Sequence, residues 1–254
     1  MTQLTLDPSL LTTFLLVLAR TTAWTASSPL TSSKTLPPQT RLAIGLALAI
    51  FTTPLARGTA PQDLGSFAFA ALIQIGIGLG LGFLSSLVLT AVEAAGHLAD
   101  LGAGFSMGTT FDPVTGKDAA TLARFSTMVM LTLLFATDGA STMVAGFVRS
   151  FAALPLDRLP TLSGSGVALL GHAAAQLTAA GVQIGAPVIG VSFLTDFGLG
   201  LMARFVPQAS PLQLAMPIKA LAGLAAFGTM LTLLPMQLDT LVNGGLQLGG
   251  RVFS

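Results

Sequence analysis

The sequence predicts an all-α, polytopic membrane protein with about six hydrophobic, partly kinked helical segments. Of its 254 residues, 52% are hydrophobic and only 8% are charged, and the mean hydropathy is +0.82. An average soluble domain carries about 25% charged residues, so this composition rules out a disordered chain and argues against a soluble enzyme. The apolar runs are long, rich in Ala, Leu and Gly, and lack the alternation of a membrane β-barrel. The spans should therefore be helices, which satisfy their own backbone hydrogen bonds in lipid.

The first three segments come before the middle of the chain, and a span needs about 20 mostly apolar residues. Ser9–Trp24 is interrupted only by Arg20, which we expect to extend its charge to the lipid interface rather than to act as a functional intramembrane group. Leu42–Leu55 is short for a span. The third segment predicts a span most strongly, because no charge lies between Asp63 and Glu93.

The fourth segment lies between Arg124 and Arg149 and contains Asp138. A charge at membrane depth is either a proton relay or a group that hydrogen-bonds a neighbouring helix, and we favour the second interpretation. Basic residues are spread over all the connections, so the positive-inside rule gives no orientation.

The last two segments contain prolines. Pro187 lies inside Val167–Leu194 and is expected to bend or split that helix. Leu212–Leu238 carries Lys219 near its start, two residues after Pro217. Lys219 is therefore an intramembrane charge that we expect to mark the beginning of a helix.

Four glycines in the third segment predict close helix packing. Gly76 with Gly80, and Gly78 with Gly82, form two overlapping G-x-x-x-G pairs. Glycines at this spacing let another helix backbone approach closely. A dinucleotide site is excluded, because the G-x-G-x-x-G spacing is not met and no strand precedes it.

A glycine-rich stretch follows Glu93 and is the most unusual part of the sequence. Phe105, Met107 and Phe111 place large apolar groups among glycines, and Asp112–Pro113 is a turn signal. Two interpretations stay open: a flexible surface loop, or a loop that lines or closes a cavity. In the second case the bulky groups would block a pore by filling it and excluding water.

No catalytic, cofactor-binding or metal site is predicted. His97 and His172 lie far apart, the chain has no cysteine, and no P-loop or nucleophile elbow is present. The net charge of +1 gives no indication of a nucleic-acid partner.

Several motifs follow one another in a characteristic order along nearly the whole chain. They are L-A-R-T-T-A-W-T-A-S-S-P-L (Leu18–Leu30), L-P-P-Q-T-R-L-A-I-G-L-A-L-A-I (Leu36–Ile50), E-A-A-G-H-L-A-D-L-G-A-G-F-S (Glu93–Ser106), Asp112–Pro113, G-A-P-V-I-G (Gly185–Gly190), D-F-G-L-G-L-M-A-R-F-V-P-Q (Asp196–Gln208) and M-P-I-K-A-L-A-G-L (Met216–Leu224). This order resembles the FliR family, the integral membrane component of the flagellar type III export gate, which has relatives in virulence injectisomes.

The resemblance implies a non-enzymatic export-gate subunit without cofactors, in the bacterial cytoplasmic (inner) membrane at the flagellar basal body. It implies as partners FliP and FliQ subunits, a FlhB-like export switch protein, unfolded export substrates and membrane lipid. The chain would be one integral membrane domain over residues 1–254, FliP-like over about 1–165 and FliQ-like over about 166–254. The central loop, Gly102–Gly116, would plug the closed pore. The plug residues would be Phe105, Ser106, Met107, Phe111, Asp112 and Pro113.

Other functions are weighed against this one. An injectisome homologue has the same architecture. A small secondary transporter would use Asp138 as its coupling carboxylate. An intramembrane enzyme would need a paired nucleophile and base, which the sequence does not offer.

Overall fold

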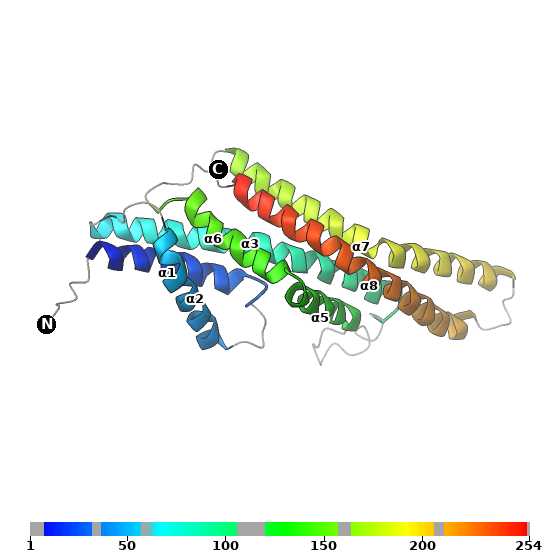
Figure 1. Cartoon of the computed structure of the whole chain (residues 1–254). Helices are drawn as coiled ribbons and strands as arrows, with labels where there is room; N and C mark the ends of the chain where they lie inside the picture. Colours follow the sequence, from blue (N-terminus) through cyan, green and yellow to red (C-terminus); the bar gives the residue numbers. More distant parts are fainter. Residues whose placement is uncertain are drawn as a thin grey trace. The chain divides into compact units, whose positions relative to one another are not determined.

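A computed structural model describes residues 8–31, 37–56, 61, 63–105, 120–156, 164–205 and 211–252. Over these residues every regular element is helical (Figure 1), which confirms the all-α prediction. The elements are α1 (Pro8–Ser27), α2 (Pro38–Thr52), the 3-10 turn η1 (Thr53–Leu55), α3 (Leu64–Gly102), α5 (Thr121–Ala136), α6 (Gly139–Ala153), α7 (Gly164–Phe205) and α8 (Pro211–Val252).

Four of the described helices, α1, α3, α7 and α8, are long and apolar enough to cross a membrane. The shorter α5 and α6 pass the same test only as a pair interrupted at Thr137 and Asp138, which raises the number to at most five. The predicted number of six is therefore slightly too high. The reason is the segment Leu42–Leu55: its helix α2 has only 15 residues and is too short for an upright crossing.

Three helices are much longer than a bilayer requires. α3 has 39 residues, and α7 and α8 have 42 each. One crossing needs about 20 residues, so each of these helices has about twice the residues that a single span requires.

Proline does not interrupt these helices where the sequence indicated a break. α7 continues through Pro187, and α8 continues through Pro217 and Pro235. Of the two outcomes expected at Pro187, a split is wrong, because α7 remains one element, and a bend stays a prediction. Long membrane helices tolerate proline when neighbouring groups satisfy the carbonyls that lose their partner. Pro38 and Pro211 instead occupy first helical positions, where a missing N–H costs nothing.

The chain forms two compact units, each built from separate stretches of sequence. Unit 1 consists of Met1–Val88, Asp138–Ala174 and Val242–Ser254, and unit 2 consists of Leu89–Thr137 and Ala175–Leu241. α3, α7 and α8 contribute to both units, whereas α1, α2 and α6 belong to unit 1 and α5 belongs to unit 2.

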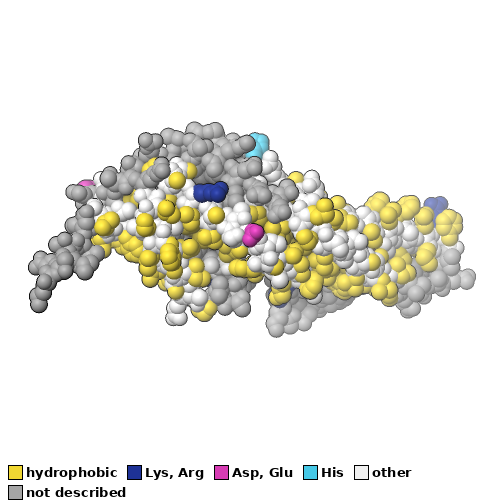
Figure 2. Space-filling view, in the orientation of Figure 1, with side chains coloured by type: hydrophobic (Ala, Val, Ile, Leu, Met, Phe, Trp, Pro, Cys, Tyr) yellow, Lys and Arg dark blue, Asp and Glu magenta, His cyan; other side chains and the backbone are white. Residues whose placement is uncertain are grey.

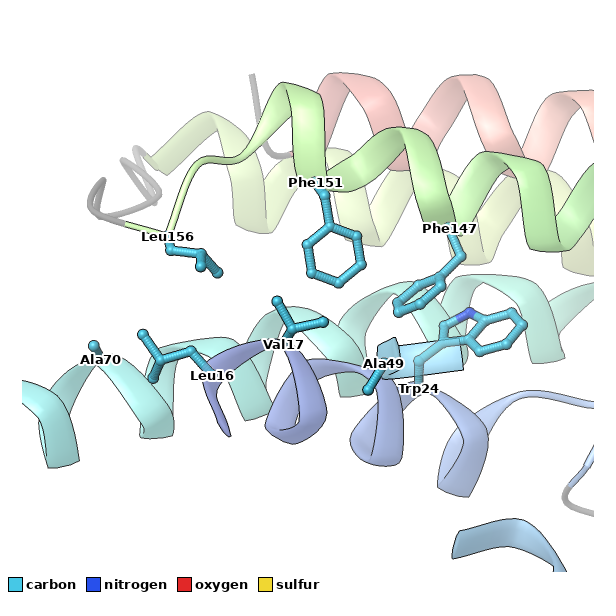
Figure 3. Close-up of a cluster of buried hydrophobic side chains, with 8 residues drawn as sticks. All are labelled: Leu16, Val17, Trp24, Ala49, Ala70, Phe147, Phe151 and Leu156. Carbon is cyan, nitrogen blue, oxygen red and sulfur yellow. The ribbon is translucent and has the colours of Figure 1, made fainter. Parts of the chain in front are cut away.

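The core of unit 1 is built around aromatic side chains (Figure 3). Trp24 of α1 stacks on Phe147 of α6 with ring centroids 4.4 Å apart, and Phe147 meets Phe151 edge-on at 5.5 Å. Each such pair contributes about 0.5–1.5 kcal/mol beyond its buried area. The aliphatic residues of the same cluster are Leu16, Val17, Ala49, Ala70 and Leu156.

The core of unit 2 uses smaller side chains on α3. Its buried face carries Val92, Ala95, Ala99 and Ala103, at a spacing of three or four residues, as expected for one face of a helix. The other helices of unit 2 contribute larger residues to this core, including Leu122, Met130, Leu134, Ile184, Val188, Met230 and Leu234.

The described surface is strongly apolar. Figure 2 shows hydrophobic side chains over much of the face in view, with few charged groups among them. In the four long apolar helices, only 28% to 39% of the most apolar stretch is buried within the chain. Exposed apolar surface of this extent requires lipid or other protein, so the chain is embedded in a membrane.

Candidate functional site

α3 ends in a Schellman motif at the start of the glycine-rich stretch. The N–H of Phe105 donates to the carbonyl of Asp100 at 3.0 Å, and the N–H of Gly104 donates to the carbonyl of Leu101 at 3.2 Å. Gly104 has a φ of 79°, a left-handed conformation that glycine adopts without steric cost. The helix therefore stops at a glycine suited to ending it.

Asp100 lies in the last turn of α3 and is only 3% exposed. Its Oδ1 accepts a hydrogen bond from the N–H of Leu122, and its Oδ2 accepts one from the N–H of Ala123, both at 3.0 Å. These N–H groups belong to the first turn of α5 and have no partner within that helix. The carboxylate of α3 therefore caps the N-terminus of α5, where a negative charge is favourable.

Three glycines allow close packing around this cap. A Cβ added to Gly96 would lie closer than 3.0 Å to the Cα of Ala123 on α5. One added to Gly223 of α8 would lie equally close to Ala103. One added to Gly102 would overlap the hydroxyl of a serine side chain on α7. The end of α3 is thus in backbone contact with α5 and α8 and in side-chain contact with α7, and larger residues at these positions would prevent this packing.

An ion pair joins α7 and α8 near the same turn. Lys219 Nζ donates to both carboxylate oxygens of Asp196 at 2.8 Å, with side chains 25% and 52% exposed. Its Cδ would lie 3.8 Å from a Cβ at Gly104. The expectation that Lys219 marks a helix beginning is wrong, because α8 begins already at Pro211. Lys219 instead lies within α8 and pairs with an acidic side chain of α7, and its depth in the membrane stays a prediction.

Of the six expected plug residues, the structure describes Phe105 alone. Phe105 directly follows the turn at Gly104 and is 38% exposed. The other five residues, Ser106, Met107, Phe111, Asp112 and Pro113, lie outside the described residues. The plug therefore stays a prediction. The structure describes the two flanks of the loop, which are the end of α3 up to Phe105 and the beginning of α5.

Arg20 is fully buried in unit 1, so the expectation that it reaches the lipid interface is wrong. Its Nε donates to Gln74 Oε1 at 2.6 Å, Nη1 to the carbonyl of Ser150 at 3.3 Å and Nη2 to the carbonyl of Leu154 at 3.0 Å. The guanidinium carbon also lies 4.5 Å from the ring centroid of Phe151. All of these partners are neutral. Two of them are carbonyls at the C-terminus of α6, the negative end of its dipole.

The four glycines of the third segment lie in different environments. A Cβ at Gly78 or at Gly82 would lie closer than 3.0 Å to carbonyl oxygens of α1. A Cβ at Gly76 would meet nothing within 4 Å, and Gly80 is partly buried. The structure thus places Gly78 and Gly82 against α1 and leaves Gly76 on an open face of α3.

Asp138 lies at the break between α5 and α6 and is exposed. Its backbone carbonyl accepts hydrogen bonds from the hydroxyls of Ser141 and Thr142, and its side chain does not cap α6. Both interpretations of this carboxylate, the hydrogen bond to a neighbouring helix and the proton relay, stay predictions.

Asp100 and Gln74 make buried hydrogen bonds that the sequence patterns did not predict. Asp100 stands within the motif Glu93–Ser106, and no pattern in that motif assigned it a role. An acid in the last turn of a helix opposes that helix's own dipole, which was a signal that its partner lies elsewhere. Gln74 is the one amide side chain in the long charge-free run, and a buried amide needs a partner. Sequence alone could not identify either partner.

Comparison with known proteins agrees with this architecture. The chain matches the family described as bacterial export proteins, family 1, over residues 11–245. It is 29% identical over 220 residues to the flagellar biosynthetic protein FliR of Caulobacter vibrioides, covering 85% of this chain and 87% of that protein. It is 27% identical over 183 residues to the Yop proteins translocation protein T of Yersinia pestis, covering 71% and 70%. It is 26% identical over 223 residues to the surface presentation of antigens protein SpaR of Salmonella typhimurium, covering 87% and 83%.

The family match begins within α1 and ends within α8, so it includes both units with their buried charges and the glycine contacts around Asp100. The chain therefore belongs to the bacterial export proteins, family 1.

Proposed function

We propose that the chain is a subunit of the type III protein export gate of the flagellum, in the bacterial cytoplasmic (inner) membrane at the basal body. FliP and FliQ subunits complete the channel, a FlhB-like protein acts beside it, and unfolded substrates pass through it. The subunit performs no chemistry of its own. The similarity to FliR, a protein named for flagellar biosynthesis, supports the flagellar assignment. An injectisome homologue is the alternative, since two relatives are named for translocation and for surface presentation.

The observation that carries the proposal is the exposed apolar surface of α3. Leu64 at its beginning is 82% exposed and Leu101 near its end is 64% exposed. Leucine side chains that the chain itself leaves this exposed are covered by lipid or by partner subunits. This exposed apolar surface supports a place in a membrane-embedded assembly.

The proposal includes the division of the chain into two related parts. The FliP-like part, about 1–165, contains α1 to α6, and the FliQ-like part, about 166–254, contains nearly all of α7 and α8. The division falls close to the connection between α6 and α7, which supports it because a part joined there keeps its helices whole.

The proposal also includes the plug. Phe105, Met107 and Phe111 fill the closed pore and exclude water, which stops ions without any charged barrier. Phe105 follows the end of α3 and is 38% exposed. This exposure supports the role because the side chain is not buried in the core of unit 2.

Purification of the tagged chain from its native membrane, followed by mass spectrometry, tests the proposal. We expect two other small hydrophobic proteins with FliP and FliQ sequences to accompany the chain at fixed ratios. A chain that emerges alone, or as a homo-oligomer, contradicts the gate and favours a transporter. Disruption of the gene separates the two export systems: loss of flagella supports the flagellar gate, and loss of injectisome secretion with normal motility supports the alternative.

A further inference from the structure

We propose that Asp100 is a positioning residue: it fixes the end of α3 and the beginning of α5, the two flanks of the central loop, relative to each other. The inference rests on the proposed function only for its effect on pore closure. The contacts of Asp100 with Phe105, Leu122 and Ala123 do not depend on the proposed function, and they can be tested separately.

One residue contacts both flanks through different atoms. The backbone carbonyl of Asp100 accepts the hydrogen bond from Phe105, the last described residue before the stretch. Its carboxylate accepts the hydrogen bonds from Leu122 and Ala123, just after the stretch. Asp100 therefore fixes two points of the chain. Its peptide carbonyl fixes the residue that follows the end of α3, and its side chain fixes the first turn of α5.

The chemistry of the site requires a carboxylate. Each carboxylate oxygen of Asp100 accepts one hydrogen bond from an N–H group of α5. Because the residue is only 3% exposed, water does not readily replace a hydrogen bond that is lost. An asparagine of the same shape has one acceptor oxygen and one NH₂ group. One of the two N–H groups of α5 would then face a donor instead of an acceptor.

A second contact fixes the same register. Gly96, one turn before Asp100 on α3, lies against the backbone of Ala123, the residue that Asp100 caps. The N-terminus of α5 is therefore held by steric fit from one residue and by hydrogen bonds from another. An acid in the last turn of α3 opposes the dipole of α3 and matches the dipole of α5, so its position is explained by α5 rather than by its own helix.

The test uses Asp100→Asn, with Glu93→Gln as the matched control. Glu93 lies on the same helix, is exposed, and loses the same charge. Amide hydrogen exchange of the purified complex is the first readout. We expect exchange in the first turn of α5 to become at least about tenfold faster in Asp100→Asn and to stay unchanged in Glu93→Gln, because each lost hydrogen bond of this kind changes an equilibrium by about that factor. Unchanged exchange in Asp100→Asn overturns the inference.

Ion leak across membranes that carry the complex is the second readout, with the triple variant F105S/M107S/F111S as the benchmark. We expect Asp100→Asn to leak at normal complex yield. A leaking triple variant beside a tight Asp100→Asn overturns the positioning role. A tight triple variant instead contradicts the plug itself, and the exchange readout then decides the role of Asp100 alone.

Ala120→Asp separates positioning from simple helix capping. Ala120 is the N-cap residue of α5, so a carboxylate there can cap α5 without any link to α3. In the double variant Asp100→Asn/Ala120→Asp we expect slow exchange to return and the leak to persist. A leak that returns to the wild-type level overturns the inference, because capping of α5 alone would then suffice.

Discussion

Among the residues that the structure describes, each of the two units buries one charged side chain, Arg20 or Asp100, and its hydrogen-bond partners there are neutral. In unit 1 the cation Arg20 donates to carbonyls at the C-terminus of α6, and in unit 2 the anion Asp100 accepts from N–H groups at the N-terminus of α5. In both cases the charge meets the helix end of opposite partial charge. A membrane protein can thus stabilise a buried charge with backbone groups at helix ends.

The two units differ in how they bring such groups within reach. In unit 1 the guanidinium carbon of Arg20 lies 4.5 Å from the ring centroid of Phe151, which packs edge-on against Phe147 (Figure 3). In unit 2 Gly96 lets α3 approach the backbone of Ala123, next to the cap by Asp100. The short side chain of an aspartate needs such a close approach to reach a neighbouring backbone, whereas the longer side chain of an arginine reaches acceptors on two other segments of the chain.

The largest effect is expected from Arg20→Met. It leaves Gln74 Oε1 and the carbonyl of Leu154 without their donor, whereas the carbonyl of Ser150 still accepts the N–H of Leu154. At about 1–3 kcal/mol for each buried acceptor left unpaired, a loss of about 2–5 kcal/mol is expected. Quantitative immunoblots of the assembled complex should show most of it lost. Arg20→Lys should fall between this variant and the wild type, because an ammonium group lacks the planar fork that reaches separate acceptors. Arg149→Met removes an exposed arginine and serves as the control. Normal complex yield in Arg20→Met would show that the buried network contributes little.

A smaller effect is expected from Gly78→Ala, with Gly76→Ala as its matched partner two residues away on α3. The added methyl group at Gly78 overlaps the backbone of α1 and should cost about 1–3 kcal/mol. The same methyl group at Gly76 meets open space and should stabilise the helix by about 0.5–1 kcal/mol. Thermal unfolding of the purified complex, followed by circular dichroism, measures both. Equal losses in the two variants would mean that a partner subunit packs against Gly76 as closely as α1 packs against Gly78.

The smallest effect is expected from Asp138→Asn. Asp138 is exposed and its side chain does not cap α6, so the change in stability should stay within about 0.5 kcal/mol. Export, measured as secreted substrate per cell, should stay close to the wild-type level. Loss of export with normal assembly would contradict this expectation and would favour a role for Asp138 in proton coupling.

The sequence predicted the helical class and the long apolar elements well, because hydrophobic length and composition are local properties. It predicted too many spans, since the apolar run of α2 is as hydrophobic as a span but too short. Pro187 and Arg20 were misjudged for a common reason. Whether a proline breaks a helix, or whether a cation stays buried, depends on groups from distant parts of the chain, such as the carbonyls of Ser150 and Leu154. Asp100 could not be assigned a partner for the same reason, because its two bonds link residues on opposite sides of the loop.

The most direct test of the central claim is the ionic conductance of the purified gate complex reconstituted into a planar bilayer. The proposed plug predicts a closed wild-type complex and an open triple variant F105S/M107S/F111S, in which the chain length is kept and only the bulky apolar groups are removed. A triple variant that stays as closed as the wild type, with the complex intact, would contradict the claim that these three side chains close the pore.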